Sequence, residues 1–124
     1  PMMGVSPAGF NFISAPRDAI VARELDLEGL GRFLKAAPSI FPLTVLDVGQ
    51  VSDLHALKAL EYATAIFVVT TADVIVLSQT RRVLGKIQEL LFPPEMVQII
   101  VNRVAPSQVI TPQTIQRNLN RSVF

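Results

Sequence analysis

The chain has 124 residues, of which half are hydrophobic and 17% charged, so it can fill the core of one compact domain and does not read as a disordered tail. Its net charge is +1 with scattered Lys and Arg, which disfavours a nucleic-acid partner, and the lack of cysteine excludes disulfides. No apolar stretch reaches the roughly 20 residues of a transmembrane helix. We therefore expect a cytoplasmic protein with no transmembrane segment and no nucleic acid bound. Because the chain begins with Pro1, we also expect it to be an excised part of a longer protein.

The first part of the chain predicts two strands and one helix. A short apolar run predicts a strand at residues 10–14, and Ala15-Pro16-Arg17-Asp18 ends it. Asp26 is placed to cap a helix that Pro38 stops. A second run, residues 43–47, predicts a strand that ends at Asp47.

The remaining residues alternate in the same way. Helices are predicted from Ser52 or Asp53 to Tyr62, from Asp73 to about Leu91, and from Thr111-Pro112 to Asn120. Strands are predicted between them at residues 65–70 and 97–102, and residues 121–124 read as the start of another strand. The whole pattern predicts one α/β domain over residues 1–124, with a mostly parallel sheet and helices on both faces.

Polar side chains follow the three longest predicted strands. Ligands of open parallel sheets bind at the carboxyl ends of the strands, so these residues are the candidate site. Asp47 could hold a hydrated Mg²⁺ there, or it could form a turn or helix cap before Gly49. Both interpretations stay open from the residues alone.

The other candidates are hydroxyls and an amide. Thr70 and Thr71 could donate hydrogen bonds to phosphate, although hydroxyls at strand ends are more often structural. Asn102 carries a donor and an acceptor that match the edge of adenine, and Arg103 could contact phosphate or ribose. The plainer interpretation of Asn102 is a turn residue, and the plainer interpretation of Arg103 is a solvated cation. His55 has no second His or Cys and no close acidic cluster, which disfavours a metal site there.

Taken in order, three segments resemble the MinD/ParA group of deviant Walker P-loop ATPases, and most closely its CpaE/TadZ branch, which is linked to pilus assembly. The resemblance covers residues 10–124. The segments that carry it are Leu43-Thr44-Val45-Leu46-Asp47-Val48-Gly49, residues 56–73 ending in Thr70-Thr71-Ala72-Asp73, and Ile99-Ile100-Val101-Asn102-Arg103. The chain would then be the C-terminal portion of such a domain, with a Rossmann-like three-layer P-loop fold.

The resemblance implies a role for each candidate residue. Asp47 would be the Walker B carboxylate, both catalytic and near Mg²⁺, and residues 48–51 would begin a switch-like loop. Thr70 and Thr71, with the turn up to Asp73, would line the nucleotide side or the dimer face. Asn102 would read the adenine edge, and Arg103 would lie beside it. Two departures are visible: Gly49 stands where many members have proline, and the Gly-rich Walker A loop with its lysine is absent from these residues. Since that loop grips the phosphates, we expect no tight ATP binding by this chain alone, whereas the intact parent would bind ATP and Mg²⁺.

The implied function is the localisation or assembly of a pilus or secretion apparatus, with protein partners from that apparatus and homo-oligomers as the expected state. Whether the chain belongs to an enzyme stays open. Two alternatives remain: a receiver-like signalling domain, and a degenerate domain of the same fold that only binds partners. A receiver needs an acidic pair after its first strand, where this chain has Asp18 alone, and a lysine where it has Asn102-Arg103. A missing strand would also expose a sheet edge, so we expect self-association through that edge or through exposed helix faces.

Overall fold

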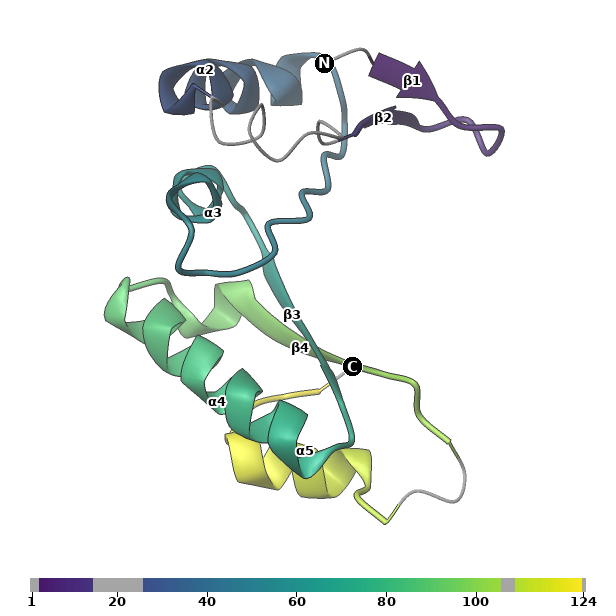
Figure 1. The fold of residues 1–124 in the computed structure, drawn as a ribbon, viewed down its shortest axis with the longest axis vertical. Coiled ribbons are helices and arrows are strands. Elements are labelled where there is room, and N and C mark those ends of the chain that lie inside the picture. Colours follow the sequence, from purple (N-terminus) through teal and green to yellow (C-terminus); the bar gives the residue numbers. More distant parts are fainter. Residues whose placement is uncertain (1–2, 15–25, 106–108, 124) are drawn as a thin grey trace. The chain divides into compact units, whose positions relative to one another are not determined.

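The computed structural model describes residues 3–14, 26–105 and 109–123, which belong to two compact units, Pro1–Thr44 and Val45–Phe124 (Figure 1). Each unit is described by itself. The predicted break at residues 15–18, including Asp18, lies outside the described residues.

The first unit opens with a hairpin of two short strands, β1 (Met3–Val5) and β2 (Asn11–Ile13), paired antiparallel. The prediction that residues 10–14 join a parallel sheet is therefore wrong. A tight turn explains the difference: the Ser6 N–H donates to the carbonyl of Phe10 at 2.8 Å, and Gly9 takes a φ of +86° that glycine adopts without strain. A turn this short can join antiparallel strands only, since parallel strands need a long crossover.

Helix α2 (Leu27–Ala36) follows and leads into the 3₁₀ turn η1 (Ala37–Ser39). Asp26 caps α2 as predicted, accepting hydrogen bonds from the N–H groups of Glu28 and Gly29 at 3.0 and 2.9 Å. A carboxylate at this position pairs N–H groups that have no partner inside the helix. The sequence predicted that Pro38 stops this helix, and α2 ends at Ala36, with Pro38 in the 3₁₀ turn that follows.

The second unit contains a parallel pair of strands, β3 (Ile66–Thr71) and β4 (Val97–Asn102). Their register runs from Ile66 beside Val97 to Thr71 beside Asn102. Val123 forms an isolated parallel bridge with Ile99, where the sequence predicted that a further strand begins. The parallel α/β class and the strands predicted at residues 65–70 and 97–102 are confirmed.

The described residues of this unit also form three helices, α3 (Leu54–Leu60), α4 (Val74–Glu89) and α5 (Pro112–Leu119), and one 3₁₀ turn, η2 (Pro94–Met96). Each helix is capped by the side chain before it, namely Asp53, Asp73 and Thr111. Hydrogen bonds from His55 hold the pKa of the Asp53 carboxyl below its ordinary value. The backbone N–H of His55 has the larger effect, and its ring has the smaller one. The charged cap therefore stabilises α3 fully at pH values above the ordinary pKa of Asp. This stabilisation is lost as the pH falls through the lowered pKa of Asp53.

No helix in the described part of the chain is long and apolar enough to cross a membrane.

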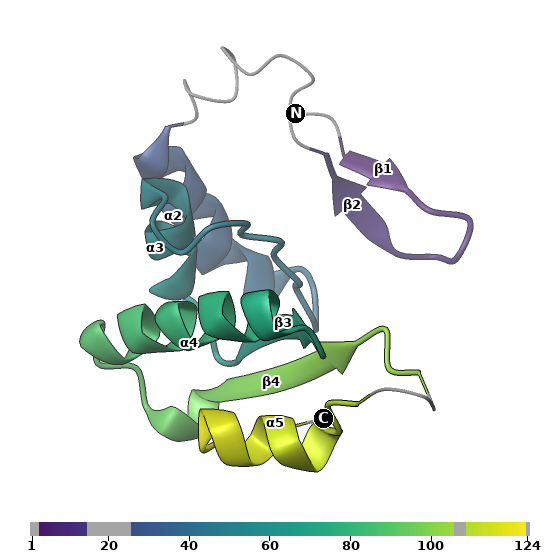
Figure 2. The same cartoon turned by 60° about the horizontal axis from the view of Figure 1, so that its bottom comes forward.

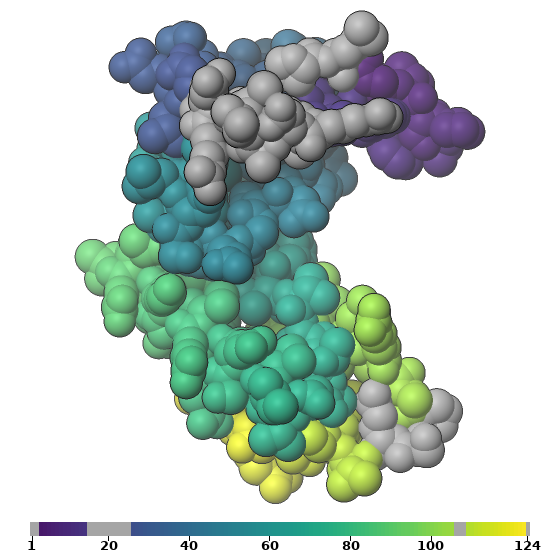
Figure 3. Space-filling model, in the orientation of Figure 1, coloured from purple at the N-terminus to yellow at the C-terminus, as the bar shows by residue number. Residues whose placement is uncertain are grey.

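The core of this unit lies on one face of the sheet. Ile66, Val97 and Ile99 point toward the helices. The side chains packed against them are Leu60 of α3, Leu84 and Ile87 of α4, and Ile115 and Leu119 of α5. Figure 2 shows α4 and α5 running beside β4, and Figure 3 shows the green surface of α4 next to the yellow surface of α5. The Arg81 guanidinium of α4 donates to the carbonyl of Asn118 at 3.1 Å.

The opposite face of the sheet carries Phe67 and Val69, which are 56% and 59% exposed. The sequence predicted helices over both faces. Among the residues that the structure describes in this unit, the helices in the core cluster pack on one face.

The strand predicted at residues 43–47 is absent: this stretch has no regular structure, and Leu43 and Val45 are 79% and 84% exposed. A strand is defined by hydrogen bonds to a neighbour, and among the described strands β3 pairs with β4. An apolar run shows only that a segment suits burial. It does not supply the partner strand.

Candidate functional site

The candidate site lies at the carboxyl edge of the sheet, where β3 and β4 end side by side. Thr71 and Asn102 are register partners there, so Thr70 and Arg103, their neighbours in the chain, lie next to the same edge. The parallel arrangement thus brings together four of the five residues that the sequence singled out. Asp47 belongs to the loop that precedes α3.

Thr70 is the buried member of this group, with 1% of its surface exposed. Its hydroxyl oxygen lies 2.8 Å from that of Thr80 in α4, and the Thr80 hydroxyl lies 2.8 Å from the carbonyl oxygen of Val76. The two hydroxyls therefore join strand to helix inside the core. This geometry favours the structural interpretation of Thr70 over donation to a ligand.

Replacing Thr80 with valine is expected to lower the free energy of unfolding by about 1–3 kcal/mol, because it removes the short hydrogen bond of the buried Thr70 hydroxyl. Urea denaturation followed by circular dichroism measures this. Thr64 is exposed, and Thr64→Val makes the same chemical change with an expected effect within about 0.5 kcal/mol. Equal stability of the Thr80→Val and wild-type chains would show that this contact contributes nothing.

Next along the chain, Thr71 is part-exposed and Asp73 begins α4. The Asp73 carboxylate accepts hydrogen bonds from the N–H groups of Ile75 and Val76 at 2.8 and 3.1 Å. Asp73 is therefore engaged in capping, and Thr71 is the threonine at this edge whose side chain reaches solvent.

At the end of β4, Asn102 and Arg103 are both exposed. The side-chain carbonyl of Asn102 accepts a hydrogen bond from the N–H of Arg103 at 2.8 Å, and Arg103 has a left-handed backbone with φ of +56°. A residue other than glycine rarely adopts that conformation, and such residues cluster at functional sites. In this conformation the amide acceptor of Asn102 is engaged in the turn that ends the strand.

Asp47 is exposed and accepts a long hydrogen bond, 3.4 Å, from the N–H of Gly49, whose φ is +60°. This is the turn-forming geometry that the sequence left open beside the magnesium interpretation. Among the residues described, no three His, Cys, Asp or Glu side chains are grouped to hold a metal ion. A lone carboxylate still suits Mg²⁺, which keeps several waters and binds one or two carboxylates together with substrate phosphates.

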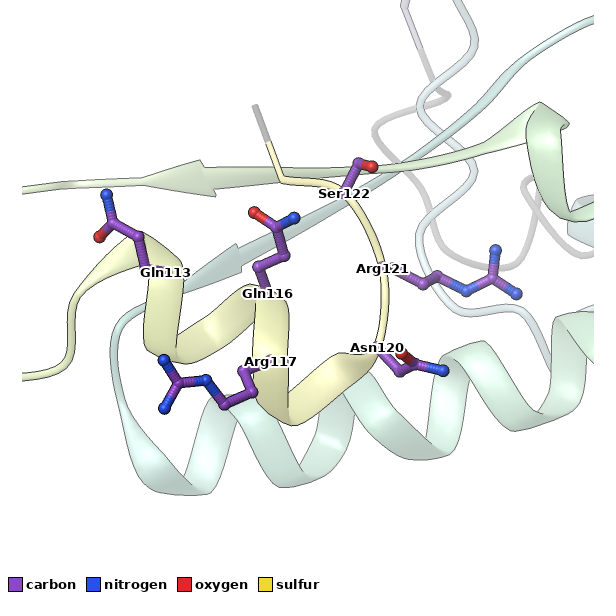
Figure 4. A pocket seen from close by; sticks show the side chains of 6 residues that line it. All are labelled: Gln113, Gln116, Arg117, Asn120, Arg121 and Ser122. Atoms are coloured by element: carbon purple, nitrogen blue, oxygen red, sulfur yellow. The ribbon is translucent and has the colours of Figure 1, made fainter.

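Sequence reasoning did not single out a polar depression at the end of α5, with a volume of about 580 Å³ (Figure 4). Its lining residues are Gln113, Gln116, Arg117, Asn120, Arg121 and Ser122. Figure 4 shows Arg117 and Arg121 pointing away from each other, and the Arg121 guanidinium donates to the carbonyl of Pro94 at 3.1 Å. Because the two charges diverge, the depression does not form a converging anion site. The polar composition of the helix was the only sequence signal for it.

Comparison with known proteins gives a structural likeness. No protein-family model matches the sequence, and no curated protein matches it either. The chain is similar to the crystal structure of a ParA family ATPase from Chlorobium tepidum TLS, with a TM-score of 0.88 and 23% sequence identity over 98% of this chain. It covers 51% of that protein and so spans about half its length. At this identity the likeness shows the fold, which is that of part of a ParA-type P-loop ATPase.

Proposed function

We propose that this chain forms part of a MinD/ParA-type ATPase domain of the CpaE/TadZ kind. The observation that carries the proposal is the likeness to the ParA family ATPase over nearly the whole chain. The carboxyl edge supports it, because Thr71 and Asn102 lie beside each other where α/β proteins of this kind bind ligands. The proposed setting is the cytoplasm, with homo-oligomers and components of a pilus or secretion apparatus as partners.

In this proposal the intact parent binds Mg²⁺ and ATP. Asp47 holds the hydrated metal ion, Asn102 reads the edge of adenine, and Arg103 and Thr71 contact the phosphates or ribose. Thr70 acts by fixing β3 against α4 through Thr80, since its own hydroxyl is buried. The turns at Asp47 and Asn102 would open when the nucleotide binds, because each now uses a side-chain oxygen locally.

A titration of Mg·ATP into the 124-residue chain is expected to show no tight binding by calorimetry. Phosphate capture in this fold depends on backbone N–H groups of a Gly-rich loop and on a lysine, which these residues lack. The same titration into a longer natural polypeptide that includes such a loop is expected to show binding. Sub-millimolar affinity of the short chain would mean that the phosphate site lies elsewhere, and no binding by a loop-bearing polypeptide would contradict the proposed function.

The second candidate is a domain of the same fold that binds partners without nucleotide. The local use of Asp47, Asp73 and Asn102 in turns and caps favours it. The two candidates differ in one measurable property: a domain that only binds partners has no ATP-dependent change in stability, whereas a nucleotide-binding parent is stabilised by Mg·ATP. The receiver-like alternative lacks support from the likeness to a ParA family ATPase.

A further inference from the structure

The carboxyl end of β3 and the first turns of α4 form a segment that is closed at both of its ends. β3 ends at Thr71, and Asp73 then caps the start of α4. Further along the helix, the Thr80 hydroxyl donates back to the Thr70 hydroxyl at 2.8 Å. The turn after Thr71 is therefore held by the chain itself on one side and by a buried hydrogen bond on the other.

The two hydroxyls continue as a series toward the carboxyl edge of the sheet. Thr70 and Thr80 are 1% and 4% exposed, so their hydroxyls depend on partners inside the protein. Each hydroxyl has one proton to donate. When Thr80 donates to Thr70, the Thr70 hydroxyl donates in turn to the backbone carbonyl of Thr71, in a long contact of 3.4 Å. The Thr80 oxygen also lies 2.8 Å from the carbonyl oxygen of Val76, which holds its side chain against its own helix.

We propose that Thr80 is a positioning residue for the candidate site. Through Thr70 it fixes the backbone of Thr71, so that the Thr71 hydroxyl meets a phosphate or ribose oxygen of the nucleotide beside Asn102. This proposal rests on the proposed function, which supplies the ligand. Thr80 itself touches no ligand, because it is buried in α4. Its effect is on placement, and a binding site needs its groups held to within about 0.5 Å.

Two substitutions of Thr80 separate positioning from stability. Thr80→Val keeps the shape of the side chain and removes the hydroxyl, so it breaks the series. Thr80→Ser keeps the hydroxyl and removes a buried methyl group. Both variants are expected to be less stable than the wild type, the first through a lost hydrogen bond and the second through a cavity. Only Thr80→Val is expected to disturb the end of β3.

Hydrogen exchange of backbone amides, followed by NMR in the 124-residue chain, tests this step without a nucleotide. Thr71 and Asn102 mark the carboxyl edge, and Ile66 and Val97 mark the other end of the same two strands. In Thr80→Val, exchange at the edge is expected to rise about threefold or more relative to the other end, because local opening adds to global unfolding. In Thr80→Ser, both ends should change equally. An equal change at both ends in Thr80→Val would show a loss of stability alone and overturn the proposal.

Calorimetric titration of Mg·ATP into a longer natural polypeptide that includes a phosphate loop tests the effect on the ligand. Thr80→Val is expected to raise the Kd about three- to tenfold, the effect of one weakened hydrogen bond to a charged group, and Thr80→Ser to stay within about twofold of the wild type. In a Thr71→Val background, Thr80→Val should add little, because both changes act on one contact. Equal increases for Thr80→Val and Thr80→Ser, or full additivity with Thr71→Val, overturn the proposal. A wild-type polypeptide that fails to bind Mg·ATP contradicts the proposed function, and the exchange pattern still shows whether Thr80 fixes the edge.

Discussion

Ile99→Ala is expected to destabilise the second unit by about 2–5 kcal/mol. Ile99 has no exposed surface, and it lies in the middle of β4 between Val68 on one side and Val123 on the other. Truncating it leaves a cavity where the strands meet the helices, and small domains have only about 5–15 kcal/mol of stability in total. Urea denaturation monitored by circular dichroism measures the change, and a matching fall in the melting temperature should accompany it.

The neighbouring residue provides the control. Ile100→Ala removes the same atoms from the same strand, but Ile100 is only part-buried and lies on the face that the core does not use. We expect a clearly smaller loss for Ile100→Ala, since the surrounding solvent fills the space. Equal losses for the two variants would contradict a core that lies on one face of the sheet.

The helices were predictable because their signals are local. Asp53, Asp73 and Thr111 each bond N–H groups two or three residues ahead, so the sequence around each helix start contains the whole cause. The strands at residues 65–70 and 97–102 were predictable for a related reason. The long helix α4 between them is the crossover that a parallel pair requires.

The two wrong predictions concern pairing, which is not local. Residues 43–47 have the apolar composition of a buried strand, yet Val45 is 84% exposed because no described strand lies beside it. Residues 11–13 do form a strand, but the turn through Gly9 offers them a nearer, antiparallel partner. The composition of a segment shows whether its side chains suit a buried strand. It does not show which strand will pair with that segment.

The candidate site shows the same division. Parallel strands place their carboxyl ends together, so the meeting of Thr71 with Asn102 followed from the fold class. Thr70 is buried and Thr71 is part-exposed because the described helices cover only the face on which Thr70 lies. The apolar run that precedes them has no alternation of apolar and polar residues, so the sequence did not show which face is covered. The contact between Thr70 and Thr80 joins residues of two elements, and only the packed structure shows it.

Asp47→Ala, made in a longer natural polypeptide that carries this chain together with a phosphate loop, is expected to lower ATP hydrolysis by about 10–100-fold, the usual effect of disturbing a metal ion's surroundings. Binding of ATP should fall much less, since the phosphate loop supplies most of it. In this structure Asp47 is exposed and tied only loosely to Gly49, so its removal should leave the fold intact. Steady-state hydrolysis and calorimetric binding, measured on the same preparation, separate the two effects.

Asn102→Ala in the same polypeptide is the informative comparison, because it changes the carboxyl edge of the sheet and, in the proposed function, does not contact the metal ion. We expect it to reduce the preference for ATP over GTP, since a site that hydrogen-bonds a base edge leaves polar groups unpaired with the wrong base. If Asp47→Ala lowered binding and hydrolysis equally, Asp47 would not act on the metal ion in the reaction. Unchanged hydrolysis would place Asp47 in the turn before Gly49 and nowhere in the chemistry.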